Sequence, residues 1–167
     1  MQIRDATESD LPGILAIYNH VIATSDAVYT ETPATLEDRH VWFAARRASN
    51  YPVLVAVEDR MPGKDPVLGF ASFGDFRPWR GYALSVEHSV HVHHDARGRG
   101  IGSALVRRLI DDARGLGKHV MIGGIDAENA ASIALHAKLS FTEAGRLREV
   151  ARKFGRWLDL LFMQRML

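Results

Sequence analysis

The fold of this chain follows from residues 91–105, which read His91-Val92-His93-His94-Asp95-Ala96-Arg97-Gly98-Arg99-Gly100-Ile101-Gly102-Ser103-Ala104-Leu105. A strand-like run over 84–92 leads into this stretch, and apolar residues then recur at three- and four-residue steps, as in an amphipathic helix. Glycines at the junction allow a sharp turn and the close approach of a ligand. The unpaired N–H groups of a first helical turn favour an anion there. The sequence predicts a phosphate-binding loop formed by Arg97, Gly98, Arg99, Gly100, Ile101, Gly102 and Ser103.

Three other interpretations of this loop compete. A Walker loop needs Lys and then Ser or Thr after its last glycine, but Ser103-Ala104 follows Gly102. The dinucleotide-binding pattern lacks its third glycine, because Ser103 stands there. A turn without a ligand is the remaining alternative. The pattern Arg97-x-x-Gly100-x-Gly102 after a strand instead resembles the acetyl-coenzyme A pyrophosphate loop of the GNAT superfamily of N-acetyltransferases.

Composition limits the class of protein. The 167 residues suit one domain over 1–167, and 47% hydrophobic with 25% charged residues is ordinary for a globular chain. A net charge of +1 gives no reason to expect nucleic acid or a membrane as partner. The absence of cysteine excludes disulfides and thiolate chemistry. No apolar leader or membrane-length run is present, so we expect a cytoplasmic protein.

The order of elements predicts the fold class. We expect strands near 2–6, 51–58, 67–73, 84–92, 119–125, 141–150 and 157–166. Helices are expected near 11–22, 35–50, 101–116 and 126–138, and a hairpin connection over 59–66. This order, β-α-α-β-β-β-α-β-α-β-β, looks like the N-acetyltransferase fold. It implies an α/β (α+β) architecture with a mixed, mostly antiparallel sheet of about seven strands and about four flanking helices.

Four local stretches narrow the resemblance to one branch of the superfamily. They are Glu31-Thr32-Pro33 and the segments over 86–90, 129–136 and 153–159. Together they resemble the phosphinothricin and methionine sulfone/sulfoximine acetyltransferases. The resemblance implies acetyl-CoA as cosubstrate, no metal, direct transfer in a ternary complex, a small amino-acid analogue as acceptor, and a homodimer.

Acetyl transfer from a thioester needs a neutral amine, a stabilised oxyanion and a proton for the leaving thiolate. Glu87 is our candidate for the base, the alternative being a surface salt bridge. His136 matches the histidine of the phosphinothricin branch, and its role as proton donor, auxiliary base or structural residue stays open. Strict alternation would separate Glu87 and Ser89 from His88, but the resemblance implies a bulge and splayed strands here.

The resemblance also assigns binding residues. The backbone of Val90, His91 and Val92 would pair with the pantetheine arm, and the Val90 N–H would support the oxyanion. Asn129 would contact the same arm, unless it only caps a helix.

For the acceptor, Arg77 and Arg80 offer paired hydrogen bonds to a carboxylate or phosphinate. A loop over 74–81 would carry them, with a solvated crossing loop as the alternative. The expected substrate contacts are Tyr29, Glu31, Arg77, Pro78, Trp79, Glu87, His88 and Ser89.

Two questions remain open. The pattern His91-x-His93-His94 suggests a metal site, because imidazoles are common zinc ligands. The missing cysteine and the neighbouring arginines disfavour a cation there, so we expect no metal ion. A peptide or protein N-terminal acetyltransferase would use the same loop, and an acidic groove would favour it. A non-catalytic CoA sensor would dispense with Glu87 and His136.

Overall fold

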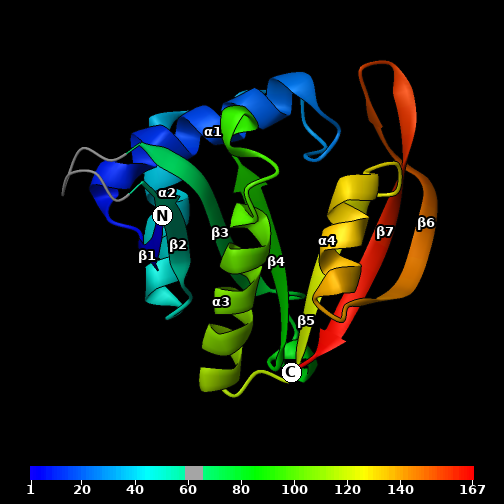
Figure 1. Cartoon of the computed structure of the whole chain (residues 1–167). Coiled ribbons are helices and arrows are strands. Elements are labelled where there is room, and N and C mark those ends of the chain that lie inside the picture. The colour runs from blue at the N-terminus through cyan, green and yellow to red at the C-terminus, as the bar shows by residue number, and fades with distance from the viewer. Residues whose placement is uncertain (59–65) are drawn as a thin grey trace.

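The computed structural model describes residues 1–58 and 66–167, so most of the hairpin connection predicted over 59–66 lies outside the described residues. One seven-stranded sheet has the order β1-β2-β3-β4-β5-β7-β6 (Figure 1). Among the strands of the described residues, only β4 and β5 pair in parallel, and the other neighbours are antiparallel. The mixed, mostly antiparallel sheet confirms the predicted fold class. The strands are β1 (Gln2–Asp5), β2 (Val53–Val57), β3 (Val67–Asp75), β4 (Ser85–Val92), β5 (Val120–Asp126), β6 (Thr142–Lys153) and β7 (Arg156–Met166).

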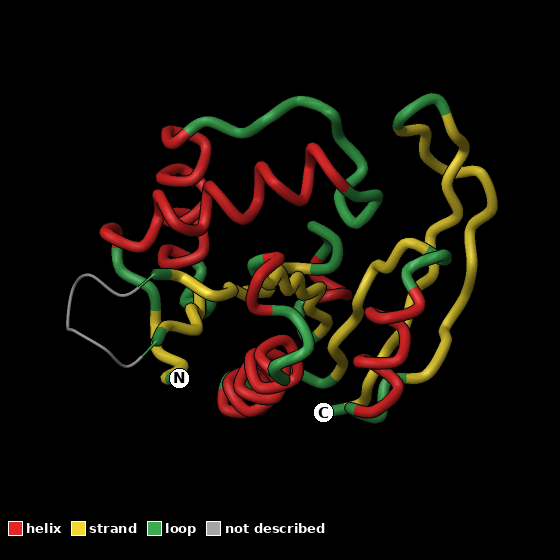
Figure 2. The backbone as a smooth tube through the Cα atoms, turned by 45° about the horizontal axis from the view of Figure 1, so that its top comes forward, coloured by secondary structure: helices red, strands yellow, loops and turns green. Residues whose placement is uncertain are grey.

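Helices cover both faces of the sheet (Figures 1 and 2). They are α1 (Leu11–Thr24), α2 (Leu36–Ala48), α3 (Ile101–Gly115) and α4 (Ala130–Lys138). One apolar cluster joins α1 and α2 to Val53, Val55 and Phe70, while a larger one joins α3 to Leu54 and Ala71. Because neighbouring residues of β2 and β3 enter different clusters, the sheet has two buried faces. None of the helices within 1–58 and 66–167 has the length and apolar character needed to cross a membrane.

The parallel pairing of β4 with β5 is short. It runs from Ser85 opposite Val120 to His88 opposite Gly123, although β4 continues to Val92 and β5 to Asp126. On its other edge β4 stays paired with β3 without a register shift, from Asp75 opposite Val86 to Gly69 opposite Val92. The expected splay is therefore present, and the expected bulge is absent, because unbroken pairing with β3 keeps β4 regular.

The β6–β7 hairpin extends beyond the rest of the sheet (Figure 1). Strand β6 ends at Lys153 rather than near the predicted residue 150. Its register shifts between Leu147 and Ala151, where Glu149 adopts a φ of 51°. The Glu149 N–H donates to the Asp159 carboxylate at 2.8 Å, which gives this donor a partner where the pairing with β7 is interrupted, and the strand continues to Lys153.

The tip of this hairpin holds the connection between α1 and α2. The buried Lys153 Nζ donates to the carbonyl oxygens of Ser25 at 2.5 Å and Val28 at 2.8 Å. The backbone N–H of Phe154 donates to Glu31 at 3.0 Å. These contacts join segments more than 120 residues apart and fix residues 25–31 against the hairpin.

We expect Lys153→Met to lower the free energy of unfolding by about 1–3 kcal/mol, because two carbonyl oxygens lose a charged donor. Urea denaturation of the whole chain measures this, with the exposed Lys138→Met as the matched control. Equal stability of the two variants would show that the Lys153 contacts contribute nothing.

Candidate active site

An open cleft of about 980 Å³ lies where β4 and β5 part. It is lined from the β4 side by residues of the free strand edge, from β5 by residues 123–126, and from above by the start of α3. Of the predicted site residues, those lining it are His88, Ser89, Val90, His91, Val92, Arg97, Gly98, Gly100, Ile101, Gly102, Ser103, Asn129 and His136. The structure thus brings the predicted phosphate loop and the predicted pantetheine-binding edge into one cleft.

The glycine loop enters α3 in the conformation that the sequence predicts. Gly98 and Gly100 have φ values of 76° and 78°, in the left-handed region that glycine occupies without strain. Gly100 caps α3, so the N–H groups of its first turn have no partner within the helix and face the cleft. Arg97 lines the cleft, whereas Arg99 lies 3.3 Å from Glu58 in an exposed ion pair.

Asn129 lies at the start of α4, next to the same cleft. Its side-chain oxygen accepts from the backbone N–H of Ser132 at 3.1 Å, which makes it the N-cap of the helix. The capping role is observed, and a contact with the cofactor arm stays a prediction.

Side chains of β4 alternate between the two faces of the sheet. Val86, Val90 and Val92 pack in the α3 cluster. His91 points the other way, and its ring centroid lies 5.8 Å from that of Tyr18 in α1. Alternation therefore places Glu87 on the α1–α2 side and His88 on the α3 side.

Glu87 is half-buried and has a cationic neighbour, Arg77. Its Oε2 lies 3.8 Å from Arg77 Nη1, and a Cβ atom on Gly124 would lie 3.0 Å from its Oε1. Burial raises the pKa of Glu87, and the charge of Arg77 opposes this only in part. A carboxyl group with a raised pKa is suited to taking a proton near neutral pH.

Residues around Glu87 form a second group, outside the lining of the cleft. Arg77 stacks on Phe76 with 4.0 Å to the ring centroid, and Phe76 meets Phe162 of β7 edge-on at 6.2 Å. Trp79 is 68% exposed and contacts Tyr82. Pro78 and Arg80 are exposed in the same loop. Of the predicted acceptor residues of this loop, Arg77 lies beside Glu87, and the contacts of Pro78, Trp79 and Arg80 with an acceptor stay predictions.

His88 and His136 form a buried pair on the α3 side. Their Nε2 atoms lie 3.0 Å apart, and Phe141 packs against both rings at 5.3 Å and 5.2 Å. A Cβ atom on Gly123 would lie 3.0 Å from His88 and 3.2 Å from His136. Burial lowers the pKa of both histidines.

Tyr29 and Glu31 make contacts that differ from the predicted lining role. The Tyr29 hydroxyl lies 3.2 Å from Asp126 Oδ2 and 3.0 Å from the Asp159 carbonyl oxygen. Burial raises the pKa of Tyr29, and the negative charge of Asp126 raises it further. Glu31 accepts from the backbone N–H of Phe154. Tyr29 therefore attaches the α1–α2 connection to β5 and β7, and Glu31 attaches it to the tip of the β6–β7 hairpin. Neither is among the residues that line the cleft.

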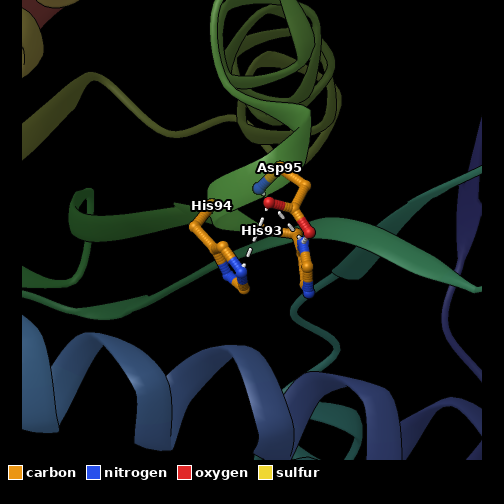
Figure 3. A group of neighbouring side chains, drawn as sticks. All are labelled: His93, His94 and Asp95. Atoms are coloured by element: carbon orange, nitrogen blue, oxygen red, sulfur yellow. Dashed lines mark hydrogen bonds and ion pairs between the residues drawn. The ribbon is translucent and has the colours of Figure 1, made fainter.

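His93, His94 and Asp95 cluster beside the phosphate loop (Figure 3). Asp95 lies 3.4 Å from His94 Nε2 and 4.0 Å from His93 Nδ1. The two rings stack at 4.3 Å with 28° between their planes, and His20 of α1 stacks on the far side of His94. The ligand atoms of the three residues lie within 4.8 Å of one another, and His93 Nδ1 accepts from the backbone N–H of Asp95 at 3.3 Å, so the expected absence of a metal stays a prediction.

Sequence reasoning missed Gly123 and Gly124. These consecutive residues face opposite sides of β5, and each leaves room for one candidate catalytic group. The signal was present, since glycine within a strand often marks a close approach. Phe162, beside Gly124 and Phe76, was also missed, because its alternation with Leu158 and Leu160 is equally typical of a core strand.

Comparison with known proteins gives the family. The family model described as the acetyltransferase (GNAT) family matches residues 14–141. A curated L-methionine sulfoximine/L-methionine sulfone acetyltransferase from Pseudomonas paraeruginosa is 51% identical over 162 residues, which cover 97% of this chain and 92% of the relative.

Solved structures agree with this match. A ribosomal-protein-alanine N-acetyltransferase from Brucella melitensis has a TM-score of 0.94 and 51% identity, with all of both chains covered. A putative acetyltransferase from Salmonella typhimurium, solved with its cofactor acetyl-CoA, has a TM-score of 0.94 and 46% identity, covering 99% of this chain and 93% of its own. Because the family model covers most of the length of the chain, this chain belongs to the acetyltransferase (GNAT) family.

Proposed function

We propose that this protein transfers the acetyl group of acetyl-CoA directly to the α-amino group of a small amino-acid analogue. The proposed acceptors are methionine sulfone, methionine sulfoximine and phosphinothricin. The observation that carries this is the opening between β4 and β5, with a phosphate loop at one end and the His88–His136 pair in its lining, while Glu87 lies against Gly124 of that lining. The name of the relative from Pseudomonas paraeruginosa supports the acceptor class.

The cleft supports the binding of acetyl-CoA. Positive charge from Arg97 and the free N–H groups at the start of α3 suit a pyrophosphate. The free edge of β4 offers backbone groups of Val90, His91 and Val92 to the amide groups of an extended pantetheine arm, as a neighbouring strand would. A backbone N–H on this edge, such as that of Val90, would stabilise the oxyanion.

The acceptor amine would approach from the α1–α2 side. Glu87 would take the ammonium proton, because burial raises its pKa toward the range of a useful base. Arg77, 3.8 Å from Glu87, would bind the carboxylate or the oxidised centre of the acceptor. Phe76 and Phe162 would form the apolar wall beside them.

A protein or peptide acceptor is the second candidate, and the name of the structure from Brucella melitensis favours it. Against it, the cation beside Glu87 is Arg77, which suits the carboxylate of a free amino acid, a group that the N-terminal residue of a peptide lacks.

We expect Glu87→Gln to lower kcat by about two to four decades at neutral pH while acetyl-CoA binding changes little. The base is active above the raised pKa of Glu87, so wild-type kcat falls as pH falls through that pKa. The variant should lose this acidic limb, and higher pH should partly restore its rate because more amine is then neutral.

Stopped-flow thiol release across pH measures these rates, and calorimetry measures binding. Glu143→Gln, at an exposed glutamate of β6, is the matched control and should behave as wild type. Wild-type turnover of Glu87→Gln would remove Glu87 from the mechanism.

The acceptor proposal predicts a ranking of kcat/KM. Methionine sulfone, methionine sulfoximine and phosphinothricin should exceed methionine by about two decades or more, since a thioether leaves the arginine donors unpaired. Thiol release with each amino acid and with an alanine-initiated peptide tests this. A peptide that matches the oxidised analogues would establish the second candidate and refute the first.

We also propose a homodimer. Apolar side chains are exposed on the projecting β6–β7 hairpin, including Leu147, Val150, Phe154 and Trp157. Exposed apolar groups gathered on one element favour association. Light scattering at micromolar concentration should give about twice the mass of one chain, and Trp157→Lys should shift the equilibrium toward the monomer. A wild-type monomer contradicts the proposal.

A further inference from the structure

The contacts of His88 and His136 cannot all be hydrogen bonds if both rings are neutral. His88 Nδ1 lies 2.9 Å from the carbonyl oxygen of Ile122, and His136 Nδ1 lies 2.7 Å from that of Ser132. A carbonyl oxygen only accepts, so each Nδ1 must carry a proton. The Nε2 of a neutral ring with Nδ1–H has only a lone pair. Two such atoms 3.0 Å apart would oppose lone pair to lone pair.

Moving a proton within the neutral pair does not remove the conflict. If one ring carried its proton on Nε2, its Nδ1 would be bare against a carbonyl oxygen at 2.9 Å or 2.7 Å. The Ser132 hydroxyl, 3.4 Å from His136 Nδ1, is too distant to offset the closer carbonyl. At separations of 2.7–3.0 Å no water fits between the facing atoms to relieve such a contact.

We propose that His88 and His136 share one additional proton between their Nε2 atoms, so that the pair holds a single positive charge. Each Nδ1 then donates to its carbonyl oxygen, and the Nε2–H–Nε2 bond is charge-assisted. Burial lowers the pKa of each ring and so opposes a positive charge on the pair. For the same reason the pair does not take up a second additional proton. The extra proton belongs to the pair rather than to either ring.

The surroundings leave the pair to titrate by itself. β5 presents the backbone of Ile122 and Gly123, α4 presents Ser132, and Phe141 packs against both rings. Glu87 lies on the opposite face of β4. No acidic or basic side chain within 1–58 and 66–167 forms an ion pair with either ring.

The role of this charge rests on the proposed function. Both rings line the cleft on the α3 side, where the phosphate loop lies. A fixed positive charge there stabilises negative charge on the sulfur as the carbon–sulfur bond breaks. His88 acts as a positioning residue, because it keeps the additional proton on the pair.

Nitrogen-15 spectra of the histidine-labelled whole protein at neutral pH test the pair directly. We expect both Nδ1 atoms protonated and the two Nε2 atoms with equal shifts between those of bare and protonated nitrogen, lost together in one step as pH rises. A bare Nδ1 on either ring, or two separate titration steps, would overturn the shared proton.

His88→Gln supplies the matched variant, since its amide N–H can donate to His136 Nε2 without charge. His136 should then become a neutral ring protonated at Nδ1. Wild-type kcat should fall as pH rises through the pKa of the pair, and in His88→Gln this alkaline limb should vanish, with kcat about a hundredfold lower and acetyl-CoA affinity little changed.

The exposed His119→Gln should match wild type in both measurements. An alkaline limb that persists in His88→Gln would refute the role of the charge. The spectra need no acetyl transfer, so an inactive protein with a shared proton would refute the proposed function alone, whereas an active protein with two neutral rings would refute the pair alone.

Discussion

The short parallel pairing between β4 and β5 is the constraint on which the site depends. After His88 and Gly123 the two strands part, yet β4 stays straight because β3 remains paired with it as far as Val92. The free edge of β4 is therefore held in regular strand geometry by β3 while it stays unpaired with β5. An edge that is already ordered can bind an extended ligand arm without losing further conformational entropy. The same divergence opens the cleft directly in front of the first turn of α3.

Two consecutive glycines make this opening usable from both sides. A side chain on Gly124 would meet Glu87, and one on Gly123 would meet His88 and His136. Since neighbouring residues of a strand face opposite sides of the sheet, one Gly-Gly pair provides both spaces. Each space brings a titratable group against strand backbone rather than solvent. That burial raises the pKa of Glu87 and lowers those of the histidines.

The sequence predicted what local patterns determine. Apolar periodicity located the helices and strands, and the glycines of the loop located its left-handed turns at Gly98 and Gly100. It did not predict that Tyr29 and Glu31 would hold the α1–α2 connection, because their partners Asp159 and Phe154 lie more than 120 residues away. The burial of Lys153 has the same origin, since two carbonyl oxygens in residues 25–28 hold its ammonium group.

Adjacent positions in a strand explain how two opposite requirements are met by Glu87 and His88. The proposed base must be unprotonated so that it can take a proton on the α1–α2 side of the opening, and the proposed cation must keep its proton on the α3 side. Placed in direct contact, a carboxylate and an imidazolium would neutralise one another and lose both functions. Alternation along β4 puts the sheet between them, and separate neighbours, Arg77 for Glu87 and His136 for His88, complete each group. A thioester in the gap between β4 and β5 would then meet a base on one face and a positive charge on the other.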